Sequence, residues 1–250
     1  MGEHFNPEVG FLFRNDIAKY YTSARFSPRP ASIDAIRQLT YQVQLDYIEN
    51  GAGQVQTRDA QGTFTIEFEN SDQVSLLYAD QREGLFEPFR IAQDVTIPAG
   101  DYQFESLSAT YTLGQQRPVS GAVSVEHGTF WDGHKTTVGL GSGRIEVSPR
   151  LSVEPTLSFN QVRLPFGDFD QNLVSSRITY TATPRMFVSG LVQYSSSGRA
   201  VSSNVRFRWE YESGSELFIV YNETRDTDRP GFPGLEDRAF IVKINKLFRL

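Results

Sequence analysis

Apolar and polar residues alternate along most of this sequence, and this period of two constrains the fold more than any other feature. Between Leu39 and Tyr47, apolar side chains occupy the odd positions and polar side chains the even ones. The same alternation recurs in 63–69, 107–113 and 205–211. A strand with this pattern has one apolar and one polar face. Segments with a helical period are absent, so the sequence predicts an all-β fold.

About fourteen such runs follow one another, and many span about 10–13 residues, against about 5–6 in a typical globular strand. In 135–147, Gly139, Gly141 and Gly143 interrupt the alternation and predict a bulge rather than a phosphate-binding loop, because no helix follows them. The predicted strands are 8–14, 17–27, 35–49, 54–69, 73–82, 102–114, 118–131, 135–147, 151–164, 173–183, 186–195, 201–212, 215–226 and 239–250.

The connections between these runs form two alternating sets. One set is tight, and several of its members carry a proline that favours a type I or II turn: 27–30, 70–72, 114–118, 148–150, 183–185 and 212–215. The other set is mostly longer: 50–53, 83–101, 132–134, 165–172, 196–200 and 227–238. Outer-membrane barrels show this asymmetry between short periplasmic turns and longer outer loops. The pattern therefore predicts one transmembrane up-and-down antiparallel β-barrel over 1–250, with both termini periplasmic.

The composition excludes several classes of protein. The chain has no cysteine, which excludes a disulfide framework, a cysteine zinc site and a thiol nucleophile. Its formal net charge of −6 argues against a nucleic-acid partner. Its longest apolar run, Leu217–Tyr221, is far shorter than the ~20 residues of a membrane helix. A soluble β-sandwich is the alternative to a barrel, although lysine, which protects wet sheet edges, is scarce.

The last predicted strand ends in an amphipathic segment that runs to the final residue. A terminal strand of this kind is the signal that the outer-membrane barrel assembly machinery recognises, although here the last residue is leucine rather than phenylalanine. The apolar positions that share one face are Phe240, Val242, Ile244, Phe248 and Leu250.

Several segments also match a known family: 4–10, 111–117, 205–211 followed by 214–218, Tyr221-Asn222-Glu223 and Arg225-Asp226. Together they resemble the C-terminal outer-membrane β-barrel domain of a bacterial family of unknown function. Its members carry an N-terminal module similar to family-nine carbohydrate-binding domains. The resemblance implies a location in the outer membrane of Gram-negative bacteria and a periplasmic carbohydrate-binding-like module as a partner. It brings no catalytic residues.

The polar faces of the predicted strands carry charges in two groups. The earlier strands place an acidic group there: Asp46, Glu67, Glu69, Glu126 and Glu154. The later strands place a basic group there: Arg177, Arg206, Arg208 and Lys243. One hypothesis is an acidic wall facing a basic wall across the lumen, with a field that orients solutes. The alternative is that these charges pair with neighbouring strands and fill the lumen.

The 83–101 connection is the longest, and it is too apolar for a loop in water. Its candidate constriction residues are Leu85, Phe86, Phe89 and Ile91. We expect this loop to fold into the mouth of the barrel and narrow the lumen, or to pack on the rim, rather than to meet a partner.

The sequence gives little support for a catalytic site. His127, Asp132 and His134 flank one predicted hairpin, but their spacing fixes no third metal ligand and matches no hydrolase motif. We therefore expect no enzyme, metal or cofactor. The aromatic residues expected to form girdles at the membrane interfaces are Tyr20, Tyr21, Tyr41, Tyr47, Trp131, Tyr180, Tyr194, Trp209 and Tyr211.

The predicted function is passage of small polar solutes through the lumen of a monomeric barrel, because about fourteen strands leave more room than the eight that side chains fill. The alternative is a membrane anchor with a closed lumen, which docks the carbohydrate-binding-like module. The expected partners are the lipid bilayer and the assembly machinery.

Overall fold

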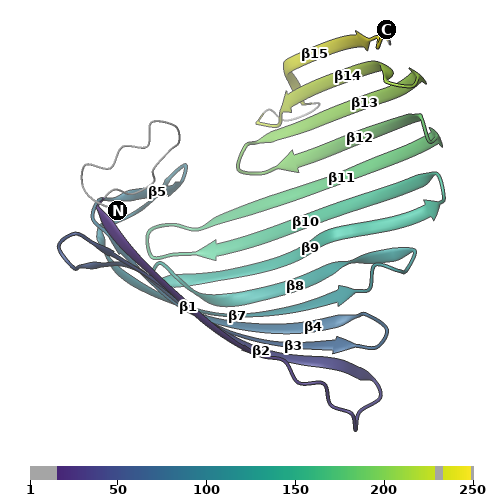
Figure 1. Cartoon of the computed structure of the whole chain (residues 1–250). Coiled ribbons are helices and arrows are strands. Elements are labelled where there is room, and N and C mark those ends of the chain that lie inside the picture. Colours follow the sequence, from purple (N-terminus) through teal and green to yellow (C-terminus); the bar gives the residue numbers. More distant parts are fainter. Residues whose placement is uncertain (1–15, 229–232, 249–250) are drawn as a thin grey trace. The chain divides into compact units, whose positions relative to one another are not determined.

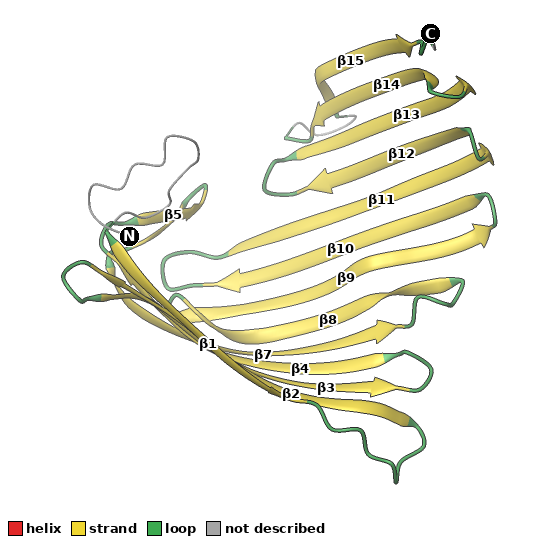
Figure 2. Cartoon of the chain, in the orientation of Figure 1, coloured by secondary structure: helices red, strands yellow, loops and turns green. Residues whose placement is uncertain are grey.

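The computed structural model describes residues 16–228 and 233–248. It is 77% strand, and the described residues contain no helix (Figure 2), so the all-β prediction is confirmed. A helix long and apolar enough to cross a membrane is accordingly not found among them. The predicted first strand, 8–14, lies outside the described residues.

Thirteen strands form one antiparallel sheet in which neighbours in sequence are neighbours in space, apart from a two-stranded hairpin, β5–β6, inserted between β4 and β7 (Figure 1). The sheet strands are β1 Ile17–Phe26, β2 Ile36–Asn50, β3 Val55–Phe68, β4 Gln73–Leu85, β7 Gly100–Leu113, β8 Val119–Phe130, β9 Gly133–Ser148, β10 Leu151–Arg163, β11 Phe169–Thr183, β12 Met186–Ser195, β13 Ala200–Glu212, β14 Ser215–Asp226 and β15 Gly234–Asn245. The hairpin strands are β5 Phe89–Ala92 and β6 Val95–Ile97.

The chain divides into two compact units. The first comprises the chain up to Tyr111 with Ser124–Thr137 and Gln161–Phe169, and the second comprises Thr112–Val123, Val138–Asn160 and Asp170–Leu250. The division passes through β8, β9 and β10 and through the ends of β7 and β11.

In the first unit, the register of the strands separates two faces, because residues directly opposite in an antiparallel ladder share a face. Phe26 lies opposite Tyr41, which lies opposite Phe64, and these ring centroids are 6.4 and 5.0 Å apart. We call this the apolar face. On the other side, which we call the polar face, Gln44 Nε2 donates to Gln61 Oε1 at 2.6 Å.

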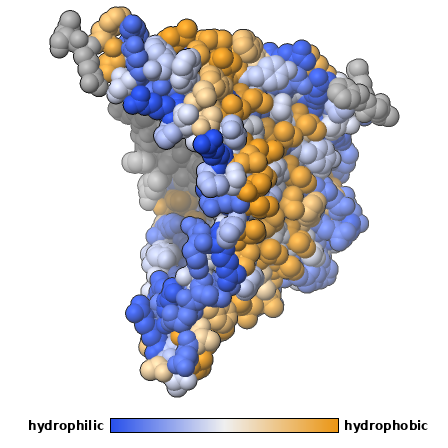
Figure 3. Space-filling model, turned by 90° about the vertical axis from the view of Figure 1, so that its right-hand side faces the viewer, coloured by the Kyte–Doolittle hydropathy of each residue, from blue (hydrophilic) through white to orange (hydrophobic). Residues whose placement is uncertain are grey.

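The second unit has the same division. Val205 and Phe207 of β13 lie opposite Tyr221 and Ile219 of β14 on the apolar face, whereas Arg208 contacts Glu216 on the polar face. Figure 3 shows apolar residues gathered on the surface turned to the viewer, with hydrophilic residues beside them. The alternation read from the sequence therefore produces two chemically distinct faces.

The predicted bulge is visible around Ser142 of β9, which has φ +50°. Before Ser142, the exposed apolar residue Val138 has an even number, whereas after it the exposed apolar residues Ile145 and Val147 have odd numbers. A bulge shifts the alternation by one residue in this way. Gly121 of β8 has φ +145°, and a Cβ there would lie 2.9 Å from the Gly143 Cα. This close approach explains the glycine at position 143, whereas a Cβ on Gly141 would have no atom within 4 Å.

The predicted asymmetry of the connections holds only in part. Residues 149–150 and 184–185 are tight turns as predicted, but the connection between β1 and β2 extends over 27–35. On the other side, Trp131 and Asp132 alone separate β8 from β9. The 86–99 segment, which contains the β5–β6 hairpin, is the longest connection between sheet neighbours among the described residues.

The prediction that the last strand runs to the final residue is wrong, because β15 ends at Asn245. Leu247 N donates to Ser215 Oγ at 3.1 Å, and a Cβ on Gly214 would lie 2.6 Å from Leu247 Cδ2. The chain thus covers the β13–β14 turn instead of continuing the ladder. Phe240, Val242 and Ile244 are exposed in β15, Phe248 is exposed beyond it, and Leu250 lies outside the described residues.

Candidate functional site

The β5–β6 hairpin packs on the polar face of the first unit and forms the buried core there. Ile97 is 0% and Val95 4% exposed. Their neighbours in the buried cluster are Tyr102, Phe104, Trp131, Val162 and Leu164. The part of the loop predicted to constrict the lumen is therefore a short hairpin held by apolar contacts.

The sequence carries a local signal for this packing. The even positions of β7 lie on the polar face, since Gln103 contacts Asp80 and Asp101 contacts Arg82 on the other face. Along these even positions, serine and threonine occupy 106–112, whereas Tyr102 and Phe104 occupy the end nearest the hairpin. Large aromatic residues on an otherwise polar face indicate where the hairpin packs.

Trp131 is the central side chain of this cluster. Its ring lies edge-on to Tyr102 and Phe104, with centroids 4.8 and 4.9 Å away. Trp131 and Asp132 have φ +46° and +61°, the left-handed values that a two-residue type I′ turn demands. A bulky residue in this conformation is strained, and packing around it offsets the cost. Trp131 is only 7% exposed, so its predicted place in an aromatic girdle is wrong.

A cavity of about 390 Å³ lies between the hairpin and the polar face. Its apolar lining residues are Leu85, Phe89, Phe104 and Trp131, and its polar lining residues are Thr57, Asp59, Gln81, Arg82 and Glu83. Both sets belong to the first unit. This volume falls within the range typical of small-molecule sites.

The polar lining residues of the cavity come from neighbouring positions on β3 and β4. Asp59 lies opposite Gln81, and Thr57 lies opposite Glu83. Thr57 Oγ1 donates to Glu83 Oε2 at 2.7 Å. Asp59 Oδ2 accepts from Gln61 Nε2 at 2.9 Å, while Asp59 Oδ1 is shielded from solvent and accepts no hydrogen bond within the part of the chain that the structure describes.

The predicted acidic residues are paired with cations of their own unit. The contacts are Asp46 with Lys19 at 2.8 Å, Glu67 and Glu69 with Arg37 at 2.8 and 3.6 Å, Glu126 with Lys135 at 2.8 Å, and Glu154 with Arg144 and Arg177 at 3.9 and 4.0 Å. The Arg177–Glu154 contact joins a member of each predicted wall on adjacent strands. This arrangement favours cross-strand pairing over separate acidic and basic walls.

The predicted basic residues are less uniformly paired. Arg208 contacts Glu216 and lies 5.9 Å from the centroid of the Phe218 ring. Arg206 and Lys243 are exposed on β13 and β15. No wall-forming geometry between the two units follows from these contacts.

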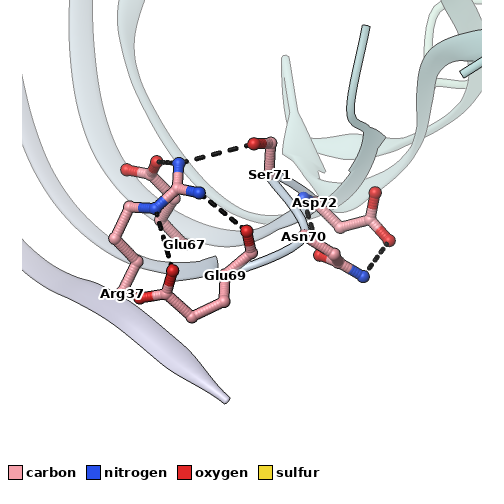
Figure 4. A network of polar contacts seen from close by, with 6 residues as sticks. All are labelled: Arg37, Glu67, Glu69, Asn70, Ser71 and Asp72. Atoms are coloured by element: carbon pink, nitrogen blue, oxygen red, sulfur yellow. Dashed lines mark hydrogen bonds and ion pairs between the residues drawn. The ribbon is translucent and has the colours of Figure 1, made fainter. Parts of the chain in front are cut away.

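An ionic network lies at the opposite end of β3 from the cavity (Figure 4). Arg37 contacts Glu67 and Glu69, donates to the Glu69 carbonyl at 2.7 Å and reaches Ser71 Oγ at 3.4 Å. Asp72, only 3% exposed, follows in the same turn. The network fixes the β3–β4 turn, so we assign it a structural role.

His127 and His134 do not line the cavity. The His127 and His134 rings are stacked with centroids 6.0 Å apart, and both side chains are exposed. His127 Nδ1 lies 2.8 Å from Thr136 Oγ1. Within the described residues, no group of three or more histidine, aspartate or glutamate side chains is placed to hold a metal.

Comparison with known proteins adds no assignment: no family model, curated protein or solved structure matches the chain. The cavity and its hairpin thus rest on the geometry alone.

Proposed function

We propose that this chain is a monomeric outer-membrane β-barrel, delivered by the barrel assembly machinery, that passes small polar solutes. In this proposal the apolar face meets lipid and the polar face lines a lumen. The β5–β6 hairpin narrows that lumen.

The observation that carries the proposal is that both units expose large residues of their apolar face, whereas the buried apolar cluster of the first unit lies on its polar face. A sheet in water covers its apolar face with another layer. Here large residues of that face are exposed, including Phe26 at 66%, Val43 at 60% and Phe240 at 67%. The buried cluster lies instead under the hairpin on the polar face. Apolar outside and polar inside is the pattern of a membrane barrel.

In this proposal the sheet closes into a barrel, because a bilayer offers no hydrogen bonds to an unpaired strand edge. β1 and β15 are the first and last strands in the sheet order of the described residues. An unpaired strand edge in a bilayer leaves backbone groups without hydrogen bonds, at several kcal/mol each. Pairing the two ends removes this cost.

Conductance in planar bilayers tests the pore. We expect small steps from the wild-type chain and larger steps when residues 87–97 are replaced by a short Gly-Ser linker, because the hairpin occupies the polar face. The matched control replaces the 196–199 connection in the same way and leaves the steps unchanged. Equal steps from wild type and hairpin variant contradict a constriction.

The second candidate is a closed barrel that anchors a periplasmic carbohydrate-binding-like module. It is favoured by the packing of the hairpin, since Ile97 is fully buried. Silence of both the wild type and the hairpin variant in the bilayer supports the anchor and contradicts the pore.

A further inference from the structure

We infer that the cavity beneath the β5–β6 hairpin binds a small organic cation, an ammonium group joined to a compact apolar body. This inference deepens the proposed function and rests on it only in treating the polar face as the surface that solutes reach. Binding itself does not require an open pore.

The charge beside the cavity is negative and incompletely compensated. Asp46 of β2 lies directly opposite Asp59 of β3, and like charges in this relation repel each other. Lys19 contacts Asp46, with Nζ 2.8 Å from Oδ1. Within residues 16–228 and 233–248, Asp59 accepts a hydrogen bond from the Gln61 amide on one oxygen and none on the other. A shielded carboxylate without a cation is costly, and an ammonium group supplies the missing charge.

Glu83 adds a second carboxylate to the cavity wall, oriented by the Thr57 hydroxyl. Arg82, the cationic residue in the lining, lies on the opposite face of β4, where its guanidinium contacts Asp101 at 2.8 Å. Arg82 therefore pairs outside the cavity, and the acidic groups in the described lining are the carboxylates of Asp59 and Glu83.

The rest of the lining suits the apolar body of such a ligand. It includes Phe89, Phe104 and Trp131. Aromatic faces attract cations, tryptophan most strongly, and they also cover apolar surface. Carboxylates and aromatic rings lining one cavity favour an apolar ammonium compound over an anion or a neutral polyol.

Trp131 provides a direct probe of the cavity. The chain has two tryptophans, so in a Trp209→Phe background the emission comes from Trp131. We expect benzylammonium to change this emission saturably in the detergent-solubilised protein. Benzyl alcohol, benzoate and methyl glucoside test the neutral, anionic and polyol alternatives, and each should bind at least about tenfold more weakly.

Substitution of the carboxylates tests their role. Asp59→Asn and Glu83→Gln should each weaken benzylammonium binding about tenfold, because an amide keeps the shape but removes the charge. The matched control, Glu154→Gln, changes a carboxylate of the second unit outside the cavity and should leave binding unchanged. Raising the salt concentration should weaken the binding of benzylammonium to the protein with both carboxylates intact. This measurement does not depend on whether a variant folds.

Equal binding of benzyl alcohol or methyl glucoside, or binding insensitive to both salt and Asp59→Asn, overturns the cation site. A fluorescence response with a silent bilayer overturns the pore and keeps the site. Conductance without a fluorescence response to benzylammonium supports the pore and overturns the cation site.

Discussion

At the scale of single residues, the turn between β8 and β9 contains two residues of the candidate site's surroundings whose conformation or packing few other residues could adopt. Trp131 holds a left-handed backbone conformation while its ring fills the hairpin cluster. Gly133, two residues later, allows a close approach between strands: a Cβ there would lie 2.0 Å from the Arg163 carbonyl oxygen. Both residues are explained by packing within one unit.

The glycine gives a stability prediction. Gly133→Ala should destabilise the folded protein by about 1–3 kcal/mol, because the backbone of β10 must move to admit the methyl group. Gly190→Ala is the control, since no atom lies within 4 Å of the added carbon. Urea unfolding in detergent measures both. Equal midpoints for the two variants would show that the approach at Gly133 is not fixed.

At the scale of elements, the sheet strands follow from the alternation and the hairpin does not. Predicted and observed bounds agree fully for β12 and β14 and differ by one residue at each end of β2 and β3. β5 and β6 lie in a segment read as a loop, because three or four residues are too few to show a period.

The edge strand β15 gives a prediction about closure. In a closed barrel its amides bond on both sides, so amide exchange should be slow at all positions of β15, as in β14. An open edge protects only the amides that pair with β14. Hydrogen exchange followed by mass spectrometry or NMR measures this. The amides of Lys246 and Phe248, beyond the strand, serve as the fast-exchanging reference. Alternating fast and slow amides along β15 would argue against closure.

At the scale of the whole molecule, the question is which face meets lipid. Trp209 lies on the apolar face and is 43% exposed, whereas Trp131 is buried under the hairpin. The two tryptophans therefore report on different surfaces of the same chain.

Their fluorescence in lipid tests membrane insertion. With brominated acyl chains, the Trp131→Phe variant, which retains Trp209, should be strongly quenched. The Trp209→Phe variant, which retains Trp131, should be quenched much less, because bromine reaches only rings at the lipid surface. Quenching of Trp131 alone, or of neither ring, would contradict a lipid-facing apolar face.

The candidate site was predicted less fully than the fold. The apolar loop, its inward or rim packing and residues Leu85 and Phe89 were named from composition. Asp59 and Gln81 were missed, because each looks like an ordinary polar position of an alternating strand. Their role appears only when β3 and β4 are placed beneath the hairpin.

The sequence by itself determined the all-β class, the succession of long strands, their two faces and a bulge within 135–147, since each depends on local alternation and backbone preference. Only the tertiary structure decided that the hairpin lies on the polar face, that Trp131 is buried and that the acidic residues pair with nearby cations. These features join residues far apart in the chain. Alternation specifies which face a side chain occupies, but not which distant segment covers it.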